Sequence, residues 1–513
     1  MNFTITTPLY YVNDSPHLGS TYTTIAADTI SRFMRLEGKS VNFITGVDEH
    51  GQKIERTANS RNLTPQGHCD KTTLMYKKLW SKLNISNNKF VRTTSNSHIS
   101  FVHSFYNKVK ASGDIRLGRQ QGWYCVGCEE YKEISSDNDS EHICNIHLNK
   151  LEWRDEENLF FKLSSYQKEI EEIVKSDSFI YPKKRRNEVI KFVERGLKDF
   201  SISRINVPWG IYVPDMPGHT FYVWFDALLG YLSVLNESTN GEPINGWPAD
   251  YHFIGKDILR FHAVYWPAML ISADLPLPKS IFGHGFLTRE GKKMGKSLGN
   301  ILEPNELIDN YGEDSVRWYL LKDIRFGDDG DFQQKRFIDL VNNDLANTIG
   351  NLLNRTSSMS RKWFNNSVPD FDPNDIIDDS LKLKCTNSVD SFIKSLYSID
   401  FQKSCEIVLD LAEFANLYLN DKAPWKNIKI EDEYYHVGEQ IYNVLETCRI
   451  IGVLLTPILP KLSNRMIQQL NYELSSIPNW HSELKWGKLA PKKELPLPEP
   501  IFSKLEVNEL PGK

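Results

Sequence analysis

The chain has 513 residues, of which 40% are hydrophobic and 25% are charged, and its formal net charge is −5. That length exceeds what one compact core supports, so several domains are expected, and the acidic balance argues against capture of nucleic acid by bulk charge, although a local basic stripe is enough to bind RNA. No apolar run approaches the roughly 20 residues of a membrane-spanning helix and no signal or transit peptide is evident, so a cytoplasmic protein is expected.

The first elements predict a strand–helix–strand unit. Residues 2–6 alternate as a short strand, and residues 7–16 are typical of a loop. Apolar residues then recur at helical spacing from near Gly19 until Gly38 ends the helix, and residues 41–44 predict a second strand. This order implies a parallel sheet and an α/β, Rossmann-like fold.

The pattern breaks from about residue 116 to residue 220, where cysteines and aromatic residues gather. We expect an insertion with a small fold of its own. Strand-like runs return at 221–225 and 251–255. Beyond about residue 340 the leucine-rich stretches 345–353, 407–419 and 441–455 predict a helical bundle.

Two segments have the composition of phosphate-binding loops. His17-Leu18-Gly19-Ser20 stands between the first strand and helix, where helix N–H groups and a glycine allow close approach of a phosphate. The segment from Gly291 to Asn300 includes Lys293-Met294-Gly295-Lys296-Ser297, and its glycines and lysines predict a mobile cationic loop. Each segment alone is weak evidence, since a solvated loop has the same composition.

In this order the two segments resemble the His-x-Gly-His and Lys-Met-Ser-Lys-Ser motifs of class I aminoacyl-tRNA synthetases. The resemblance narrows to the methionyl-tRNA synthetase family and extends along essentially the whole chain. It is supported by residues 7–13, 48–51, 222–227, 253–257, 261–262 and 265–270.

The resemblance implies that ATP and methionine form an adenylate, and that methionine then passes to the 3′ end of tRNA(Met) with its CAU anticodon. It implies that Mg²⁺ bridges the phosphates. The residues implied in ATP binding are Asn13, His17, Gly19, Ser20, Gly255, Lys256, Asp257, Lys293, Lys296 and Ser297, with His17, Lys293 and Lys296 as catalytic residues. Ser20 and Gly295 depart from the family pattern, and these departures are expected to affect the size of the rate enhancement more than the type of reaction.

The resemblance also implies a pocket for methionine. Asp48 matches the carboxylate that pairs with the substrate's amino group, and the side-chain pocket matches Leu9, Tyr11, Trp224, Ala227, Leu228, Tyr231, Ile258 and His262. Core packing is the alternative explanation for any one of these aromatic residues. A contact from Tyr11 or His262 to the substrate's sulfur is a hypothesis for how leucine is rejected.

Cys125-x2-Cys128 and Cys144-x2-His147 have the spacing of a structural zinc knuckle, with four ligands and no open position. His142 is a competing ligand. The other cysteines, Cys69, Cys385, Cys405 and Cys448, are expected to be buried thiols. The basic run from Lys183 to Arg186 is either a solvated face or a surface that meets RNA.

In the helical region Asn351 and Arg355 lie one turn apart, and with Pro424 and Trp425 they match the family's anticodon-reading set. Amide and guanidinium groups can read base edges, and tryptophan can stack on an unpaired base. A capping or surface role is the alternative for Asn351 and Arg355.

The expected architecture is thus an α/β catalytic domain in two halves, a zinc-knuckle insertion, a linker fold and a helical anticodon-binding domain. The expected bounds are 1–115 and 221–290 for the catalytic halves, 116–220 for the insertion, 291–345 for the mobile loop and stem-contact linker, 346–470 for the bundle and 471–513 for a tail that packs on the body. A monomer is expected.

Two other functions are compatible with parts of the sequence. The first is a sister class I synthetase. The pocket segments and the short insertion argue against the enzymes for leucine, isoleucine and valine, and a Cys/His knuckle with no open position, away from the pocket, argues against the enzyme for cysteine. A paralogue that binds tRNA or nucleotide without aminoacylation would suit Ser20 and Gly295, but the retained Asp48, His17 and lysines argue against it.

Overall fold

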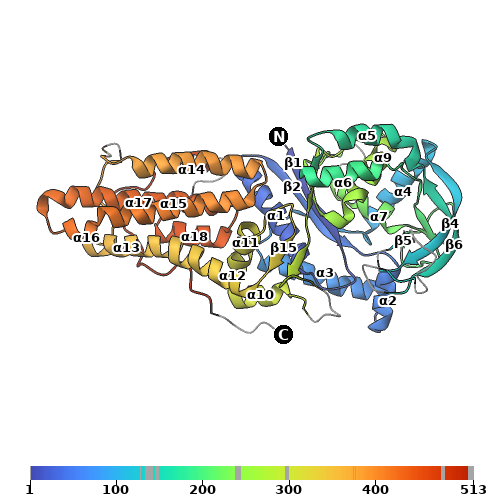
Figure 1. Ribbon diagram of the computed structural model, residues 1–513, viewed down its shortest axis with the longest axis horizontal. Helices are drawn as coiled ribbons and strands as arrows, with labels where there is room; N and C mark the ends of the chain where they lie inside the picture. The colour runs from blue at the N-terminus through green and yellow to red at the C-terminus, as the bar shows by residue number, and fades with distance from the viewer. Residues whose placement is uncertain are drawn as a thin grey trace.

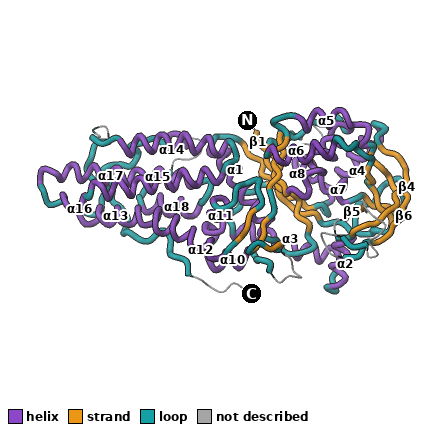
Figure 2. The backbone as a smooth tube through the Cα atoms, viewed as in Figure 1, coloured by secondary structure: helices purple, strands orange, loops and turns teal. Residues whose placement is uncertain are grey.

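The computed structural model describes residues 2–127, 129–132, 142–144, 149–236, 244–294, 300–373, 375, 377–474 and 480–506. The molecule is elongated: the strands gather in one half, and helices build the other half (Figures 1 and 2). Among the described helices, none combines the length and apolar character needed to cross a membrane.

A six-stranded sheet in which all neighbouring strands run parallel forms the centre of the strand-containing half. Its spatial order is β3 (Lys89–Arg92), β2 (Ser40–Asp48), β1 (Asn2–Tyr11), β11 (Tyr251–Gly255), β12 (Ser280–His284) and β7 (Ile180–Tyr181). The predicted α/β class is confirmed. The direction of winding reverses between β1 and β11, and in such sheets ligands bind beyond the carboxyl ends of the strands at the reversal.

Strand β1 is longer than the sequence predicts. It continues through the expected loop to Tyr11, with a shift of register against β2 between Thr6 and Leu9. Pro8 lies within that shift, where a residue without an N–H group costs no ladder hydrogen bond. As a result Tyr11 lies opposite Asp48 at the end of β2.

Each face of the parallel sheet has its own hydrophobic core because neighbouring residues point to opposite sides. Phe43 and Phe253 belong to one core, and Ile44 and Ile254 belong to the other. Helices α1 (Leu18–Leu36), α3 (Pro65–Lys82), α10 (Pro304–Tyr311) and α11 (Glu313–Lys322) pack in the first core; α4 (Asn96–Ala111), α5 (Gln167–Lys175), α6 (Lys183–Val193), α8 (Gly230–Asn236) and α9 (Trp266–Ser272) pack in the second.

Within the range 116–220, a four-stranded antiparallel sheet stands apart at the far edge of the catalytic half (Figure 1). Its order is β5 (Glu130–Lys132), β4 (Ile115–Cys125), β6 (Glu152–Phe161) and β8 (Phe200–Ser201). The remainder of this range is not independent, because β7 pairs with β12 of the parallel sheet and α5 and α6 pack against that sheet. The sequence pattern did not indicate this return to the main sheet.

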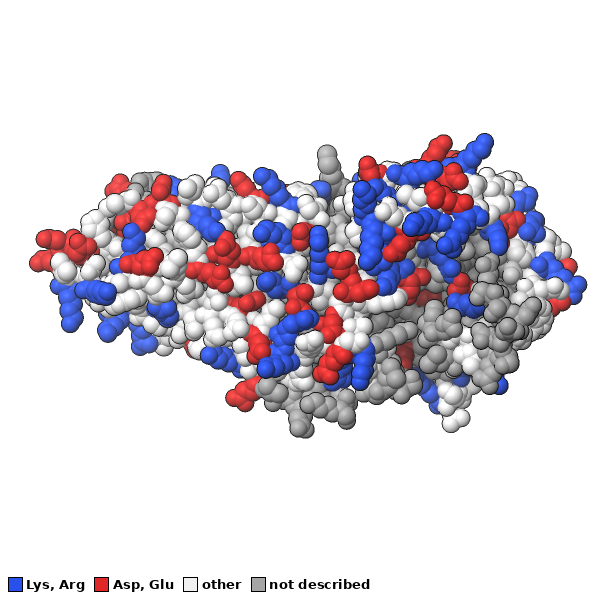
Figure 3. Space-filling model, in the orientation of Figure 1, with Lys and Arg blue, Asp and Glu red and all other residues white. Residues whose placement is uncertain are grey.

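The basic run at the start of α6 is divided between surface and interior. Lys183 and Lys184 are exposed, whereas Arg185 is buried and pairs with Glu188 at 2.7 Å. Lysines and arginines gather on this face over the region of α6 (Figure 3), while acidic and basic side chains are mixed on the bundle.

The strand predicted at 221–225 is wrong. Strand β10 (His219–Phe221), which pairs with β9 (Ser203–Ile205), ends at Phe221, and helix α7 (Val223–Leu228) begins two residues later. The aromatic and β-branched composition favours a strand in isolation. Tertiary packing overrides that preference, because Phe225 and Leu228 share one helical face and are both buried in the second core.

The bundle follows a three-stranded sheet of β14 (Lys292–Lys293), β13 (Leu287–Arg289) and β15 (Gly330–Phe332). The leucine-rich stretches form helices as predicted. The elements are α12 (Gln334–Val341), η5 (Asn342–Gly350), α13 (Asn351–Trp363), α14 (Ser380–Tyr397), α15 (Phe401–Lys422), α16 (Pro424–Asn427), α17 (Tyr434–Leu455), α18 (Pro460–Gln469) and α19 (Trp480–Glu483).

The bundle and the catalytic half share the first core without interruption. At their junction Arg317 of α11 is fully buried, lies 2.9 Å from the carboxylate of Asp28 on α1, and donates to the carbonyl of Ile458 at 2.7 Å. Breaking a buried pair of this kind leaves an uncompensated charge and costs about 3–5 kcal/mol. The two halves are therefore joined by a polar contact as well as by apolar packing.

Candidate active site and RNA-binding residues

Residues expected to bind substrate meet at the carboxyl edge of the parallel sheet. His17 follows β1, Asp48 ends β2, and Gly255 ends β11. These are the central strands at the reversal of winding. The two halves of the predicted catalytic domain therefore contribute to one place.

His17 is the N-cap of α1. Its Nδ1 accepts from the N–H of Ser20 at 3.3 Å, and the Ser20 hydroxyl accepts from the N–H of His17 at 3.1 Å and donates to the His17 carbonyl at 2.7 Å. This reciprocal arrangement satisfies helix-end donors. Because Nδ1 is an acceptor, a neutral His17 carries its proton on Nε2, and the residue is exposed. Ser20 is buried, so its hydroxyl serves the cap.

Gly19 allows this cap to form. A Cβ at Gly19 would lie 3.0 Å from two atoms of the His17 ring, tighter than ordinary van der Waals contact. The glycine thus keeps room for the imidazole beside the helix end, where N–H groups favour an anion.

Lys256 directs its ammonium group toward Asp329, at 2.6 and 2.8 Å from the two carboxylate oxygens. Asp329 also accepts from the N–H of Phe286 at 2.7 Å and so joins β11 to the segment after β12. Asp257 beside Lys256 is exposed. Asp329 was not expected from the sequence, because it lies far along the chain and outside any motif.

His284 at the end of β12 is a second residue that the sequence reasoning missed. Its Nδ1 donates to the carbonyl of Gly285 at 2.8 Å, so its Nε2 accepts from the Thr23 hydroxyl at 2.6 Å. Burial lowers the pKa of His284 to about 4, and the imidazole is therefore neutral at physiological pH. A histidine at the last position of a buried strand was the available signal.

The cationic loop begins in a defined hairpin. Asp331 of β15 accepts from the N–H of Gly291 and from the Thr288 hydroxyl, each at 2.7 Å. Met294 is half-buried against the first core. Gly295, Lys296 and Ser297, and the side chain of Lys293, lie outside the described residues.

Three of the predicted pocket residues form one hydrogen-bonded chain. His262 donates through Nδ1 to the carbonyl of Ile258 at 3.1 Å, and its Nε2 accepts from the Tyr231 hydroxyl at 2.9 Å. Burial lowers the pKa of His262 to about 4. Both ring nitrogens are thus engaged, so a polar contact to a substrate's sulfur would need one of these bonds to change.

The apolar members come from β1 and α7. Gly230 approaches Leu9 so closely that a Cβ would lie 2.5 Å from the leucine side chain. Trp224 stacks on Phe261 with ring centres 3.8 Å apart, and its buried indole N–H meets no hydrogen-bond partner among the described residues. Ala227 and Leu228 continue the same helix and are buried.

Asp48 is almost fully buried, and its pKa is raised well above the usual value. Burial is the largest cause, followed by the negative charges of Asp226 and Glu129. A carboxylate in this setting is stabilised by a cation, and a substrate's ammonium group would supply one.

Glu129 was not expected in the site. Its carboxylate accepts from the Tyr11 hydroxyl at 3.2 Å, from the Tyr124 hydroxyl at 2.5 Å and from the N–H of Lys53 at 3.0 Å. It follows Cys128 directly in the sequence, so the segment expected to bind zinc also contacts the pocket. No sequence pattern indicated this contact.

Asp226 of α7 holds two histidines together. It lies 2.7 Å from Nδ1 of His50 and 2.6 Å from Nε2 of His98, and His98 also contacts the Ser233 hydroxyl at 2.8 Å. Burial raises the pKa of Asp226, but the two histidines outweigh it and lower the pKa to about 2. The segment after β2 is thereby fixed to α4 and α7.

Two of the four proposed zinc ligands come together. Cys125 and Cys144 are buried and pack with Leu151 in a small cluster. Cys128 and His147 lie outside the described residues, and within the described ranges no group of three or more metal-binding side chains forms. The ring of His142 lies tilted against that of Trp123, with ring centres 3.7 Å apart. The cysteines Cys69, Cys385, Cys405 and Cys448 are buried, as expected.

The residues expected to read an anticodon lie on the bundle. Asn351 and Arg355 are exposed on α13, and Arg355 donates to the side chain of Asn420 near the end of α15 at 3.2 Å. Trp425 is 42% exposed directly after the buried Pro424. Figure 1 shows α13 and α16 together at the end of the molecule away from the sheet.

Comparison with known proteins agrees with this arrangement. A family described as class I tRNA synthetases (M) matches residues 3–136 and 132–357, and the anticodon-binding domain of methionyl-tRNA ligase matches residues 368–511. A methionine–tRNA ligase of Synechocystis sp. is 49% identical, with 98% of each chain covered. An Arabidopsis thaliana relative named as the chloroplastic/mitochondrial methionine–tRNA ligase is 46% identical over 99% of this chain and 83% of its own. The Mycobacterium tuberculosis methionyl-tRNA synthetase in complex with methionyl-adenylate matches with a TM-score of 0.92 and 35% identity, over 98% of this chain and 99% of that one.

Proposed function

This chain belongs to the methionine–tRNA ligases of the class I synthetases, and on that premise we propose which residues carry the reaction. The enzyme activates methionine with ATP and transfers it to tRNA(Met). The observation that supports the residue assignment is that His17 and Gly255 of the nucleotide set and Asp48 of the methionine set lie at one edge of the sheet, at the carboxyl ends of β1, β11 and β2.

The nucleotide side comprises the N-terminus of α1, the end of β11 and the loop after β14. Nε2–H of His17 donates to an α-phosphate oxygen of ATP as its charge grows during attack by the methionine carboxylate, and Mg²⁺ bound with ATP would neutralise phosphate charge. Lys293 and Lys296 bind the leaving pyrophosphate, and Ser297 accompanies them on the loop. Asn13, Gly19, Gly255, Lys256 and Asp257 line the nucleotide, and Ser20 contributes through the cap that orients His17.

The methionine side is a buried carboxylate beside an apolar pocket. Asp48 pairs with the substrate's ammonium group. The side chain occupies the space bounded by Leu9, Tyr11, Trp224, Ala227, Leu228, Tyr231, Ile258 and His262. The raised pKa of Asp48 supports this assignment, because the site gains stability when a cation arrives.

The knuckle is proposed to hold one zinc ion through Cys125, Cys128, Cys144 and His147. The buried pairing of Cys125 with Cys144 and the thiolate and imidazole donor set fit this metal. Zinc would close the knuckle without an open position. Metal analysis of the purified protein should find about one zinc per chain, and Cys144→Ser should lose it; a full-length, folded protein without zinc would contradict the assignment.

Asn351, Arg355, Pro424 and Trp425 are proposed to bind the CAU anticodon. We propose a catalytic domain at 1–115 and 221–290, a connective insertion at 116–220 of which β7, α5 and α6 pack with the catalytic sheet, a mobile-loop and linker fold at 291–345, a helical anticodon-binding domain at 346–470 and a tail at 471–513. We propose that the protein is a monomer, which light scattering tests. A cytoplasmic location is proposed and is tested by fractionation.

Lys296→Ala provides the test of the assigned chemistry. This variant should lose methionine-dependent ATP–pyrophosphate exchange, because the cationic loop acts on the transition state. Lys335→Ala, which removes an exposed lysine from the nearby helix α12, is the matched control. Near-normal exchange by Lys296→Ala would remove the loop from the mechanism.

A further inference from the structure

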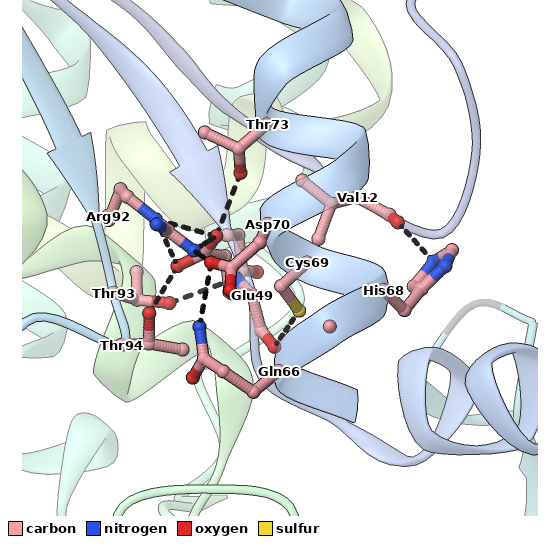
Figure 4. Close-up of polar contacts among 12 residues, drawn as sticks. Val12, Glu49, Gln66, His68, Cys69, Asp70, Thr73, Arg92, Thr93 and Thr94 are labelled. Carbon is pink, nitrogen blue, oxygen red and sulfur yellow. Dashed lines mark hydrogen bonds and ion pairs between the residues drawn. The ribbon is translucent and has the colours of Figure 1, made fainter. Parts of the chain in front are cut away.

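Glu49 is a fully buried acidic residue directly after strand β2, next to Asp48. The Thr73 hydroxyl donates to its Oε1 at 2.8 Å, and the Thr94 hydroxyl donates to its Oε2 at 2.5 Å. Arg92 approaches from the neighbouring strand β3, and Figure 4 shows all three side chains directed at the Glu49 carboxylate. The carboxylate therefore has partners from α3, from β3 and from the segment after β3.

Arg92 binds the Glu49 carboxylate in a bidentate manner, through Nε and Nη2. Its Nε lies 2.9 and 3.1 Å from the two carboxylate oxygens, and its Nη2 lies 2.7 Å from Oε1. Such planar pairing fixes orientation as well as distance. The same Nη2 also reaches Asp70 at 2.5 Å, but the Asp70 side chain is 53% exposed, whereas that of Glu49 is fully buried.

The main chain of Glu49 is held as well. Its N–H donates to the Thr93 hydroxyl at 2.9 Å, and its carbonyl accepts from the Trp209 indole at 2.5 Å and from the Cys69 thiol at 3.4 Å. These contacts matter because the ladder between β1 and β2 ends at the pair of Tyr11 with Asp48. Beyond that pair, hydrogen bonds from side chains hold the main chain of Glu49 in place of a strand ladder.

Successive residues of an extended chain point to opposite sides. Asp48 belongs to the substrate side, beside Tyr11, and Glu49 belongs to the side of α3 and β3. A displacement of Glu49 would move Asp48 through the shared peptide. We propose that Glu49, held by Arg92, is a positioning residue that fixes the Asp48 carboxylate for the substrate's ammonium group. This inference rests on the proposed role of Asp48 in binding that group.

The test compares methionine with 4-(methylsulfanyl)butanoate, which is methionine without its ammonium group. Dissociation constants for both are measured with the full-length enzyme. Glu49→Gln should raise the dissociation constant of methionine by about tenfold and that of the analogue by less than about twofold, because small misplacements of a binding group are costly. The KM for ATP should not change. If Glu49 had a purely structural role, the variant would weaken the binding of both ligands alike.

Asp70→Asn is the matched control, because it removes the exposed partner of Arg92 and leaves Glu49 in place; it should preserve both affinities. Arg92→Lys keeps the charge but loses the planar pairing, so it should reduce the preference for methionine, and it replaces Glu49→Gln if that variant does not fold. Adding Glu49→Gln to Asp48→Asn should cause little further loss of methionine affinity, because both act on one contact.

The outcomes separate the two proposals. If Asp48→Asn leaves the preference for methionine over the analogue intact, the assigned role of Asp48 fails. If Asp48→Asn abolishes the preference but Glu49→Gln and Arg92→Lys retain it, the positioning role of Glu49 is overturned.

Discussion

The Tyr11 hydroxyl donates to Oε1 of Glu129 across 3.2 Å and so joins strand β1 to the segment that follows a proposed zinc ligand. The Tyr124 hydroxyl binds the other carboxylate oxygen. The carbonyl of Glu129 accepts from Tyr222, which precedes α7. Glu129 therefore contacts the beginning, the middle insertion and the second half of the catalytic region.

Tyr11→Phe should raise the KM for methionine several-fold and reduce the preference for methionine over leucine. The variant removes one of three donors to the buried Glu129 carboxylate, and the net loss of one hydrogen bond costs about 0.5–1.5 kcal/mol of stability. ATP–pyrophosphate exchange with each amino acid measures the changes in KM and in preference, and urea unfolding measures the loss of stability. Tyr212→Phe, at a site 61% exposed, is the control. Unchanged selectivity in Tyr11→Phe would exclude a role of this hydroxyl in specificity.

The sequence predicted the parts of the fold that depend on local periodicity. Helix α1 and strand β2 follow from apolar spacing, and so do the leucine-rich helices. The strand predicted at 221–225 was wrong because the composition of this segment favours a strand, whereas its buried residues have helical spacing. The edge strand β7 could not be foreseen, since two residues carry no periodicity.

The residues of the candidate site likewise divide into those that the local sequence predicts and those that it does not. Motif residues such as His17 and Asp48 follow strands, and their place at the sheet edge follows from the topology. Glu129 and Asp329 act through contacts between distant parts of the chain. Contacts between residues so far apart in the sequence leave no local pattern from which they could be predicted.

Methionine binding should weaken as the pH falls and should release protons. The pKa of Asp48 is raised by burial and by Asp226 and Glu129, so in the free enzyme Asp48 binds a proton more readily than an ordinary aspartate. An ammonium group favours the ionised form and lowers that pKa. Calorimetry in buffers of different ionisation enthalpy measures the protons released, and Asp48→Asn should abolish the release. Proton uptake on binding would contradict this sign.

Trp425→Ala should impair aminoacylation without affecting amino-acid activation. Loss of base stacking costs about 1–3 kcal/mol, so kcat/KM for tRNA should fall by about tenfold or more, while ATP–pyrophosphate exchange stays normal. Trp425 lies in the bundle, away from the parallel sheet. Ile377→Ala, at another exposed apolar side chain of this half, is the control. An equal loss of exchange would indicate a general effect on folding.

Stability should decline between about pH 6.5 and pH 4 because buried histidines resist protonation. His262 and His284 have pKa values lowered to about 4 by burial, against 6.5 for an unperturbed histidine. The unfolded chain therefore binds more protons in this window, and stability falls as the pH falls. With about 1.4 kcal/mol for each pKa unit, each histidine costs about 2 kcal/mol at about pH 5. His284→Gln, which cannot titrate, should lose less stability than the native chain between pH 7 and pH 5 in urea unfolding. The partly exposed His436 provides the control His436→Gln, which should follow the native chain. Equal losses in the native chain and His284→Gln would show that His284 does not contribute to the acid sensitivity.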